Sequence, residues 1–124
     1  MLSNKFKADL AVFLSGEWPL IAKREWLSDD VIKVYMRKGQ HFINGNRYRT
    51  IDVANVAVLE SHQRKGLYSE LLNILKDAAQ KQGAALYVEN VINATQYPLY
   101  LRRGFTKLTP AEDGWPSYFI LPKE

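Results

Sequence analysis

The loop over residues 61–69 is the part of this sequence best suited to chemistry. It places Arg64 and Lys65 before Gly66, and a predicted helix over 67–82 follows directly. The first turn of a helix has backbone N–H groups without intrahelical partners, and the helix dipole adds partial positive charge there. Because glycine has no Cβ, a phosphate could approach the backbone closely at this point. The loop predicts an anion site, although an ordinary solvated loop explains the same residues equally well.

The other reactive side chains form no recognisable catalytic group. The chain has no cysteines, which rules out disulfides, thiolate metal ligands and a cysteine nucleophile. His41 and His62 lie in different segments and form no His-x-x-x-His pair, so we expect no metal site. Ser61 and Ser69 have no obvious base partner for a hydrolase triad. Five basic residues could line one face of a hairpin, either solvated or bound to an acidic partner: Lys33, Arg37, Lys38, Arg47 and Arg49.

Two strands are expected to hold the loop. The segment 48–59 is apolar on both faces, which is typical of a central, covered strand. Apolar residues recur at helical spacing over 67–82, and Gly83 is expected to end that helix. A short apolar strand over 85–91 follows. Strand, helix and strand at this spacing predict a right-handed crossover with two parallel strands, whose carboxyl ends hold ligands.

The N-terminal third predicts two helices. Ser3 or Asn4 is expected to cap the first, whose apolar residues keep helical spacing until Gly16. Pro19 favours a second, short helix over 20–27, because proline is tolerated at the first helical position.

The remaining elements are mostly hairpins. Alternation over 31–37 predicts a strand with one wet face, and the Asn-Gly-Asn turn at 44–46 joins it to the central strand. A helix over 93–103 should start late or irregularly, because a proline falls in its first turns. The segments 105–108 and 118–121 predict a final hairpin.

Composition narrows the class of protein. The chain has 124 residues, 47% of them hydrophobic, which predicts one domain over 1–124 with a real core. We expect no signal peptide and no membrane span, and the lack of cysteine fits a reducing, cytoplasmic location. A net charge of +4 suits a polyanionic ligand or an acidic partner, but it is too small to favour nucleic acid. A homodimer is left open.

Two spaced motifs resemble those of the GNAT superfamily of acyl-CoA N-acyltransferases. That family carries Arg or Gln, two residues, Gly, one residue, then Gly or Ala between its central strand and the next helix; Gln63 and Gly66 match. It also carries an Asn seven residues before a Tyr, with Gly-Phe four residues after that Tyr; Asn93, Tyr100 and 104–105 match. The resemblance implies an α/β (α+β) fold with a mixed, mostly antiparallel sheet, a splayed parallel strand pair and flanking helices.

The resemblance covers about residues 48–108 and implies a function. A member of this family transfers an acetyl group from acetyl-CoA to a primary amine by direct attack on the thioester. The loop backbone would hold the pyrophosphate, the central strand edge would hydrogen-bond the pantetheine arm, and Asn93 would hold the same arm from the facing strand. The implied cofactor-binding residues are Val56, Ala57, Val58, Gln63, Arg64, Lys65, Gly66, Leu67, Tyr68, Ser69 and Asn93.

Two catalytic roles follow from the resemblance. Tyr100 would be the general acid that protonates the leaving thiolate, because a phenol keeps its proton at neutral pH; a core tyrosine is the alternative. Asp52 stands where some members carry a Glu and is the candidate base, on the expectation that it shares a strand face with Val56 and Val58. Its alternative is a carboxylate paired with a neighbouring arginine, Arg47 or Arg49. Glu89 and Glu60 are weaker candidates for the base, and water in the cleft is the alternative to a protein base.

One departure from the family concerns cofactor binding. Tyr68 stands where the family usually has Gly or Ala, so its ring either narrows the approach to the phosphates or packs on the cofactor. The missing Glu and the basic hairpin support a second hypothesis, a catalytically weak or inactive CoA-binding module that acts through protein or nucleic-acid contacts. The sequence names no acceptor amine, and a small molecule, a peptide N-terminus and a protein lysine are all left open.

Overall fold

The helices and strands are seen in a computed structural model that describes residues 1–15, 18, 22–63, 65–108 and 114–123. The helices are α1 (Asn4–Leu14), α2 (Leu67–Gln82) and α3 (Tyr97–Arg102), with 3₁₀ turns at Glu60–His62 and Ala94–Gln96. The strands are β1 (Lys23–Ser28), β2 (Ile32–Ile43), β3 (Asn46–Val58), β4 (Ala85–Val88), β5 (Thr106–Leu108) and β6 (Ser117–Ile120). None of the described helices is long and apolar enough to cross a membrane.

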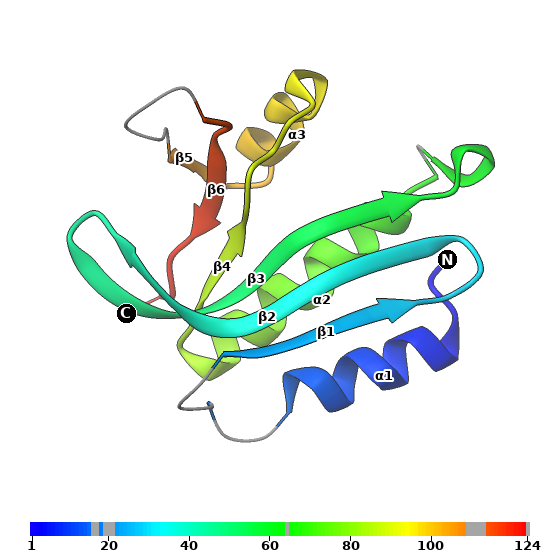
Figure 1. Cartoon of the computed structure of the whole chain (residues 1–124), viewed down its shortest axis with the longest axis horizontal. Coiled ribbons are helices and arrows are strands. Elements are labelled where there is room, and N and C mark those ends of the chain that lie inside the picture. The colour runs from blue at the N-terminus through cyan, green and yellow to red at the C-terminus, as the bar shows by residue number, and fades with distance from the viewer. Residues whose placement is uncertain (16–17, 19–21, 64, 109–113, 124) are drawn as a thin grey trace.

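The strands form one mixed sheet in the order β1-β2-β3-β4-β6-β5 (Figure 1). The pair β3–β4 is parallel and the other neighbouring pairs are antiparallel, as the sequence predicted. Side chains of α1 and α2 join one core with alternate residues of β2, β3 and β4, so both helices pack on the same face of the sheet. A smaller cluster lies on the opposite face, and it comprises Ile43, Ala85, Tyr87 and Phe119.

The predicted bounds of α2 are confirmed at both ends. Gly66 precedes the helix at φ +84° and Gly83 follows it at φ +66°, both in the left-handed region that glycine adopts without strain. The residues at the expected spacing form its buried stripe: Leu67, Leu71, Leu72, Leu75 and Ala79. Ser3 caps α1, since its side chain accepts a hydrogen bond from the Phe6 N–H at 3.1 Å.

The predicted helix over 20–27 is wrong where the structure describes it. Residues 23–28 form β1, an edge strand that pairs antiparallel with β2 through Trp26 opposite Tyr35 and Leu27 opposite Val34. Its composition permits a helix, but strand pairing outweighs local propensity here. Residues 20–21, and the expected stop at Gly16, lie outside the described residues.

The other elements match their predictions more closely. Asn44 and Gly45 have φ of 53° and 85°, as a tight hairpin turn between β2 and β3 requires. The helix α3 starts only at Tyr97, after a 3₁₀ turn, which confirms the late start. The final hairpin of β5 and β6 is also confirmed.

A bulge in β3 opens the sheet. Tyr35 pairs with Asn55 and Met36 pairs with Val53, which leaves Ala54 without a partner on β2. On the other side of β3 the parallel ladder ends with Val53 opposite Val88, followed by the Glu89 N–H bond to the Val53 carbonyl at 2.9 Å. Beyond this point β3 and the chain after β4 diverge (Figure 1). We call the gap between residues 54–58 and 89–93 the wedge. The strand predicted to reach residue 91 therefore stops at Val88.

Candidate active site

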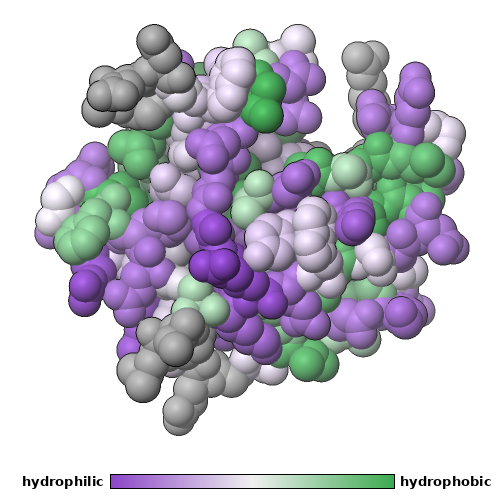
Figure 2. Space-filling view, in the orientation of Figure 1, coloured by the Kyte–Doolittle hydropathy of each residue, from purple (hydrophilic) through white to green (hydrophobic). Residues whose placement is uncertain are grey.

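A cavity of about 680 Å³ lies at the wedge, and its size is typical of a site for a small molecule or cofactor. Figure 2 shows the molecule hollowed between the end that carries α3 and the loop after β3. The strand edge, the loop, the start of α2 and the segment leading into α3 surround it. Its lining comprises Val56, Ala57, Val58, His62, Gln63, Gly66, Leu67, Tyr68, Ser69, Asn93, Thr95, Gln96, Leu99 and Arg102.

The start of α2 offers this cavity a bare helix N-terminus. The first helical bond runs from the Glu70 N–H to the Gly66 carbonyl at 2.9 Å, so the amides of the three preceding residues have no partner within the helix. Gly66 has no side chain to cap them, and a Cβ built on it would meet nothing within 4 Å. Among the described lining residues there is no carboxylate, and Arg102 adds positive charge. These features suit an anion.

Most of the predicted cofactor residues come together here. The cavity is lined by the strand edge 56–58, by Asn93 and by five of the predicted loop residues: Gln63, Gly66, Leu67, Tyr68 and Ser69. Lys65 is exposed and does not line it. Arg64 lies outside the described residues. The side-chain oxygen Oδ1 of Asn93 accepts hydrogen bonds from the backbone N–H of Thr95 at 3.0 Å and from the Thr95 hydroxyl at 2.7 Å, so Asn93 also caps the turn before α3.

Two supporting contacts were not anticipated from the sequence. Arg103 Nη2 donates to Ser69 Oγ at 2.6 Å and Nη1 to Asn73 Oδ1 at 3.4 Å, which ties the end of α3 to the first turns of α2. Gln63 Nε2 donates to the Val58 carbonyl at 3.0 Å and fixes the loop to the strand edge. These three bonds join residues far apart in sequence or in different elements, and no local pattern indicates them.

Tyr100 lies behind Tyr68 rather than on the cavity surface. Its side chain is 1% exposed, stacks on Tyr118 at 5.0 Å between ring centres, and shares a hydrogen bond with the Tyr68 hydroxyl at 2.8 Å. Tyr68 itself lines the cavity. Burial raises the pKa of Tyr100, and burial together with the neighbouring Tyr100 raises the pKa of Tyr68 well above its usual value. Both phenols therefore keep their protons at neutral pH.

Asp52 lies on the other face of the sheet. The bulge at Ala54 shifts the alternation of β3, so Asp52 faces away from the helices while Val56 and Val58 pack against the helix-side core. The expectation that these three residues share a face is wrong for this reason. Asp52 is paired with Arg37 and His41 rather than with either arginine proposed from the sequence. Glu60 is exposed in the turn after β3.

A group with metal-ligand chemistry also appears on that face. His41, Asp52 and Glu89 place potential ligand atoms within 4.8 Å of one another. Each comes from a different strand or strand end, so the spacing rule that predicted no metal site could not detect the group.

The sequence pattern of the acetyltransferase (GNAT) domain matches residues 21–107, which is well over half of the chain. The chain belongs to the GNAT acetyltransferase family. No curated protein matches the sequence.

Solved structures share the fold at low sequence identity. A structure described as histone acetyltransferase HPA2 and related acetyltransferase, from Corynebacterium glutamicum ATCC 13032, has a TM-score of 0.60 and 17% identity, covering 97% of this chain and 75% of the other. The toxin AtaT, bound to the C-terminus of the antitoxin AtaR and acetyl-CoA, has a TM-score of 0.54 and 16% identity over 73% of this chain. AtaT complexed with acetyl-methionyl-tRNAfMet has a TM-score of 0.55 and 17% identity, also over 73% of this chain. This chain spans 58% and 62% of those two AtaT chains.

Proposed function

We propose that this chain transfers an acetyl group from acetyl-CoA to a primary amine by direct attack of the amine on the thioester. The observation that carries the proposal is the wedge, where an unpaired strand edge and a bare helix N-terminus line one cavity. A pantetheine arm needs backbone partners like those of a strand, and a pyrophosphate needs clustered N–H donors. Both are present within the same cavity.

The residues present fit acetyl-CoA. The amides of Leu67, Tyr68 and Ser69 would hold the pyrophosphate, since Gly66 leaves the approach open. The edge 56–58 and Asn93 would hold the arm from its two sides. When bound, acetyl-CoA supplies an activated acetyl thioester, and the chain needs no covalent intermediate of its own.

Two residues are proposed to move protons. Tyr100 is the proposed acid, and its route to the cavity passes through Tyr68: if Tyr100 donates to Tyr68 Oη, the Tyr68 proton is free to point into the cavity. In this arrangement the Tyr100 proton is bonded to Tyr68 and the Tyr68 proton points into the cavity, so neither phenol proton is left unpaired in the core. Asp52 remains the proposed base and would act from the opposite face of the sheet.

Ligand binding and turnover test the proposal. Acetyl-CoA at a hundredfold excess over its dissociation constant should stabilise the fold by ~2.7 kcal/mol, a thermal shift of several degrees. Thiol release should then be followed with a panel of amines. Because the neighbour AtaT is solved with an acetylated aminoacyl-tRNA, the panel should include an amine carried on RNA as well as small and peptide amines. No thermal shift at millimolar acetyl-CoA would reject the proposal.

A second function is favoured by the position of Tyr68. Its ring stands between the cavity and Tyr100, where the family motif carries a small residue, so the chain could hold CoA without transferring the acetyl group. The same experiment separates the two functions. A thermal shift without thiol release for any amine, together with unchanged binding in Tyr100→Phe, would favour the binding module.

A further inference from the structure

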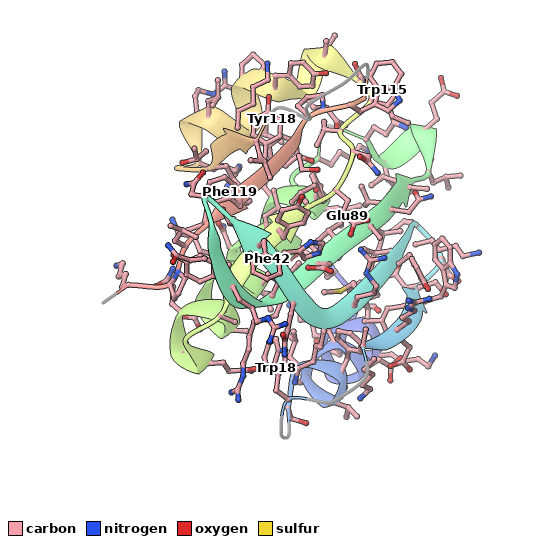
Figure 3. All side chains as sticks on the ribbon, turned by 60° about the vertical axis from the view of Figure 1, so that its left-hand side comes forward. Trp18, Phe42, Glu89, Trp115, Tyr118 and Phe119 are labelled. Carbon is pink, nitrogen blue, oxygen red and sulfur yellow. The ribbon has the colours of Figure 1, made fainter. Side chains whose placement is uncertain are left out.

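The hairpin of β2 and β3 carries an exposed aromatic ring at its tip. Phe42 is 69% exposed, whereas the next residue, Ile43, is 0% exposed in the smaller core cluster. Because successive side chains of a strand point to opposite faces, Ile43 holds the hairpin against the molecule and Phe42 points away from that cluster. Figure 3 brings the hairpin forward and labels Phe42 on it. The ring therefore adds little to the core and is accessible to a partner.

Two arginines share the face of Phe42. Directly opposed residues of an antiparallel pair point to the same side of the sheet. Arg47 is opposite Phe42, and Arg49 is opposite Gln40. We call these four residues the hairpin patch. All four are exposed, and the guanidinium carbon of Arg47 lies 5.5 Å from the centre of the Phe42 ring. The two arginines are alternate residues of β3, so their Cα atoms are about 7 Å apart.

The positive charge of the hairpin patch has no neutralising partner close by in the sequence. Residues 38–51 contain no aspartate or glutamate. In the described part of the chain, the ion pairs of arginine belong to Arg37, on the opposite face of the sheet. Arg47 and Arg49 therefore keep their charge for a partner, which must be anionic. The small net charge of the chain did not indicate this site, because strand pairing brings the two charges beside the ring.

The flat ring among the arginines selects the class of anion. An acidic peptide needs only the charges, whereas an unpaired base has a flat face that stacks on an aromatic side chain. The bases of a duplex stack on one another and offer no free face, so the partner is single-stranded. A base stacked on Phe42 would bring its neighbouring phosphates toward Arg47 and Arg49.

Exposed amide side chains at the hairpin favour RNA over DNA. Gln40 belongs to the hairpin patch, and Asn44 and Asn46 flank Gly45 at the turn. An amide both donates and accepts hydrogen bonds, as the edge of a base and a ribose 2′-hydroxyl require. Deoxyribose lacks this hydroxyl, so DNA would make fewer of these bonds.

We propose that the hairpin patch is a docking surface for single-stranded RNA: Phe42 stacks on one base, and Arg47 and Arg49 contact adjacent phosphates. The surface is separate from the cavity. Arg47 lies near the start of β3 and Val56 near its end, about 30 Å away along the strand. Figure 1 shows the hairpin turn at the left and the loop after β3 at the right. RNA bound to the patch leaves the cavity open, and the inference does not depend on acetyl transfer.

Fluorescence anisotropy tests the stacked ring. The probe is a labelled oligouridylate of about ten nucleotides, which is within the range of single-strand sites. Phe42→Ala should weaken binding about tenfold through the loss of one stacked base. Trp26→Ala is the matched control and should bind like wild type, because Trp26 is 50% exposed and lies 4.6 Å from Lys33 Nζ, but on β1. Equal weakening in the two variants, or no binding by wild type at low salt, would overturn the inference.

The salt dependence of binding tests the arginines. On a single strand, each neutralised phosphate contributes about 0.7 to the slope of log affinity against log salt concentration. Arg47→Gln and Arg49→Gln should each reduce the slope by about 0.7. Arg24→Gln removes the same charge from an exposed position on β1 and should leave the slope unchanged. An equal reduction in all three variants would mean that net charge alone attracts the RNA, which would contradict the docking surface.

Competition decides which molecule occupies the surface. Oligodeoxyuridylate of the same length, duplex RNA and oligoglutamate should each displace the labelled probe less well than unlabelled oligouridylate. Displacement by oligoglutamate as strong as by oligouridylate would identify a surface for acidic proteins, and equal displacement by oligodeoxyuridylate would remove RNA as the occupant. Acetyl-CoA binding should be unchanged in Phe42→Ala and Arg49→Gln. If both variants lose acetyl-CoA and RNA together, the two ligands share a site and the separate surface is rejected.

Discussion

The cavity in the wedge and a polar cluster on the opposite face of the sheet share β3 but differ in what they offer a ligand. We call this cluster of Arg37, His41, Asp52 and Glu89 the carboxylate cluster. The cavity presents backbone edges and a helix N-terminus, and no carboxylate lies among its described lining residues. The cluster presents two carboxylates, an arginine and a histidine, at strands whose backbone is already paired. The first region suits a polyanion, whereas the second pairs its two carboxylates with Arg37. Two regions of different chemistry thus lie on opposite faces of one strand.

The largest expected effect comes from removing Asp52, the carboxylate that contacts both Arg37 and His41. Asp52→Ala removes the buried carboxylate that Arg37 and His41 share and leaves them only Glu89, so we expect the free energy of unfolding to fall by about 3 kcal/mol. Urea denaturation measures this. The control Asp77→Ala breaks an exposed pair and should cost at most about 0.5 kcal/mol. Equal losses of stability in Asp52→Ala and Asp77→Ala would mean that the cluster contributes no more than an exposed ion pair.

The helix N-terminus should show the opposite pattern, with binding affected more than stability. Gly66→Glu puts a negative charge beside the proposed phosphate site and should weaken acetyl-CoA binding more than about tenfold. Gly45→Glu is a matched control, since Gly45 has φ +85° against +84° for Gly66 and neither Cβ would meet an atom within 4 Å. Each variant should lose about 1 to 2 kcal/mol of stability from the left-handed backbone. Calorimetric titration that found equal affinities would contradict the placement of the phosphates.

The paired phenols give a smaller effect on stability. Tyr68→Phe leaves the buried Tyr100 hydroxyl without its partner, which should cost about 1 to 2 kcal/mol. Tyr35→Phe, on the open face of β2, is the control and should be nearly neutral. Thermal denaturation compares them. If Tyr68→Phe is as stable as wild type, the two hydroxyls are not bonded in solution.

The smallest effect is a dependence on alkaline pH. The folded state raises the pKa of Tyr68 and Tyr100 above the value of about 10 in an unfolded chain. The folded state therefore holds these protons more tightly, and the stability they contribute is complete below pH about 10 and lost as the pH rises beyond it. Phenolate absorbance and melting temperature should be followed together. Tyr100→Phe should make the decline shallower, and ionisation of both phenols in the folded protein near pH 10 would contradict the prediction.

The sequence predicted the elements whose signals are local. The bounds of α2 followed from its two glycines and its leucine stripe, and the late start of α3 followed from its proline. The family motifs led to most residues of the cavity, because they lie within one strand, loop and helix. The edge strand β1 was missed because only its pairing with β2 makes it a strand.

The bulge explains the other failures. Alternation along β3 predicted one face for Asp52, Val56 and Val58, but the extra residue at Ala54 reverses the alternation between them. Nothing in the apolar run around Ala54 marks it as unpaired. The partners of Asp52 could not be predicted either, because Arg37 and His41 lie on another strand. Which residues of that strand meet Asp52 depends on the register, and the bulge changes the register.

That one unpaired residue has a kinetic consequence. If the thioester enters beside α2 and the amine arrives at the outer side of the sheet, neither blocks the entrance of the other. Both substrates can then occupy the protein together and bind in either order. Double-reciprocal plots at several fixed amine concentrations should intersect instead of running parallel.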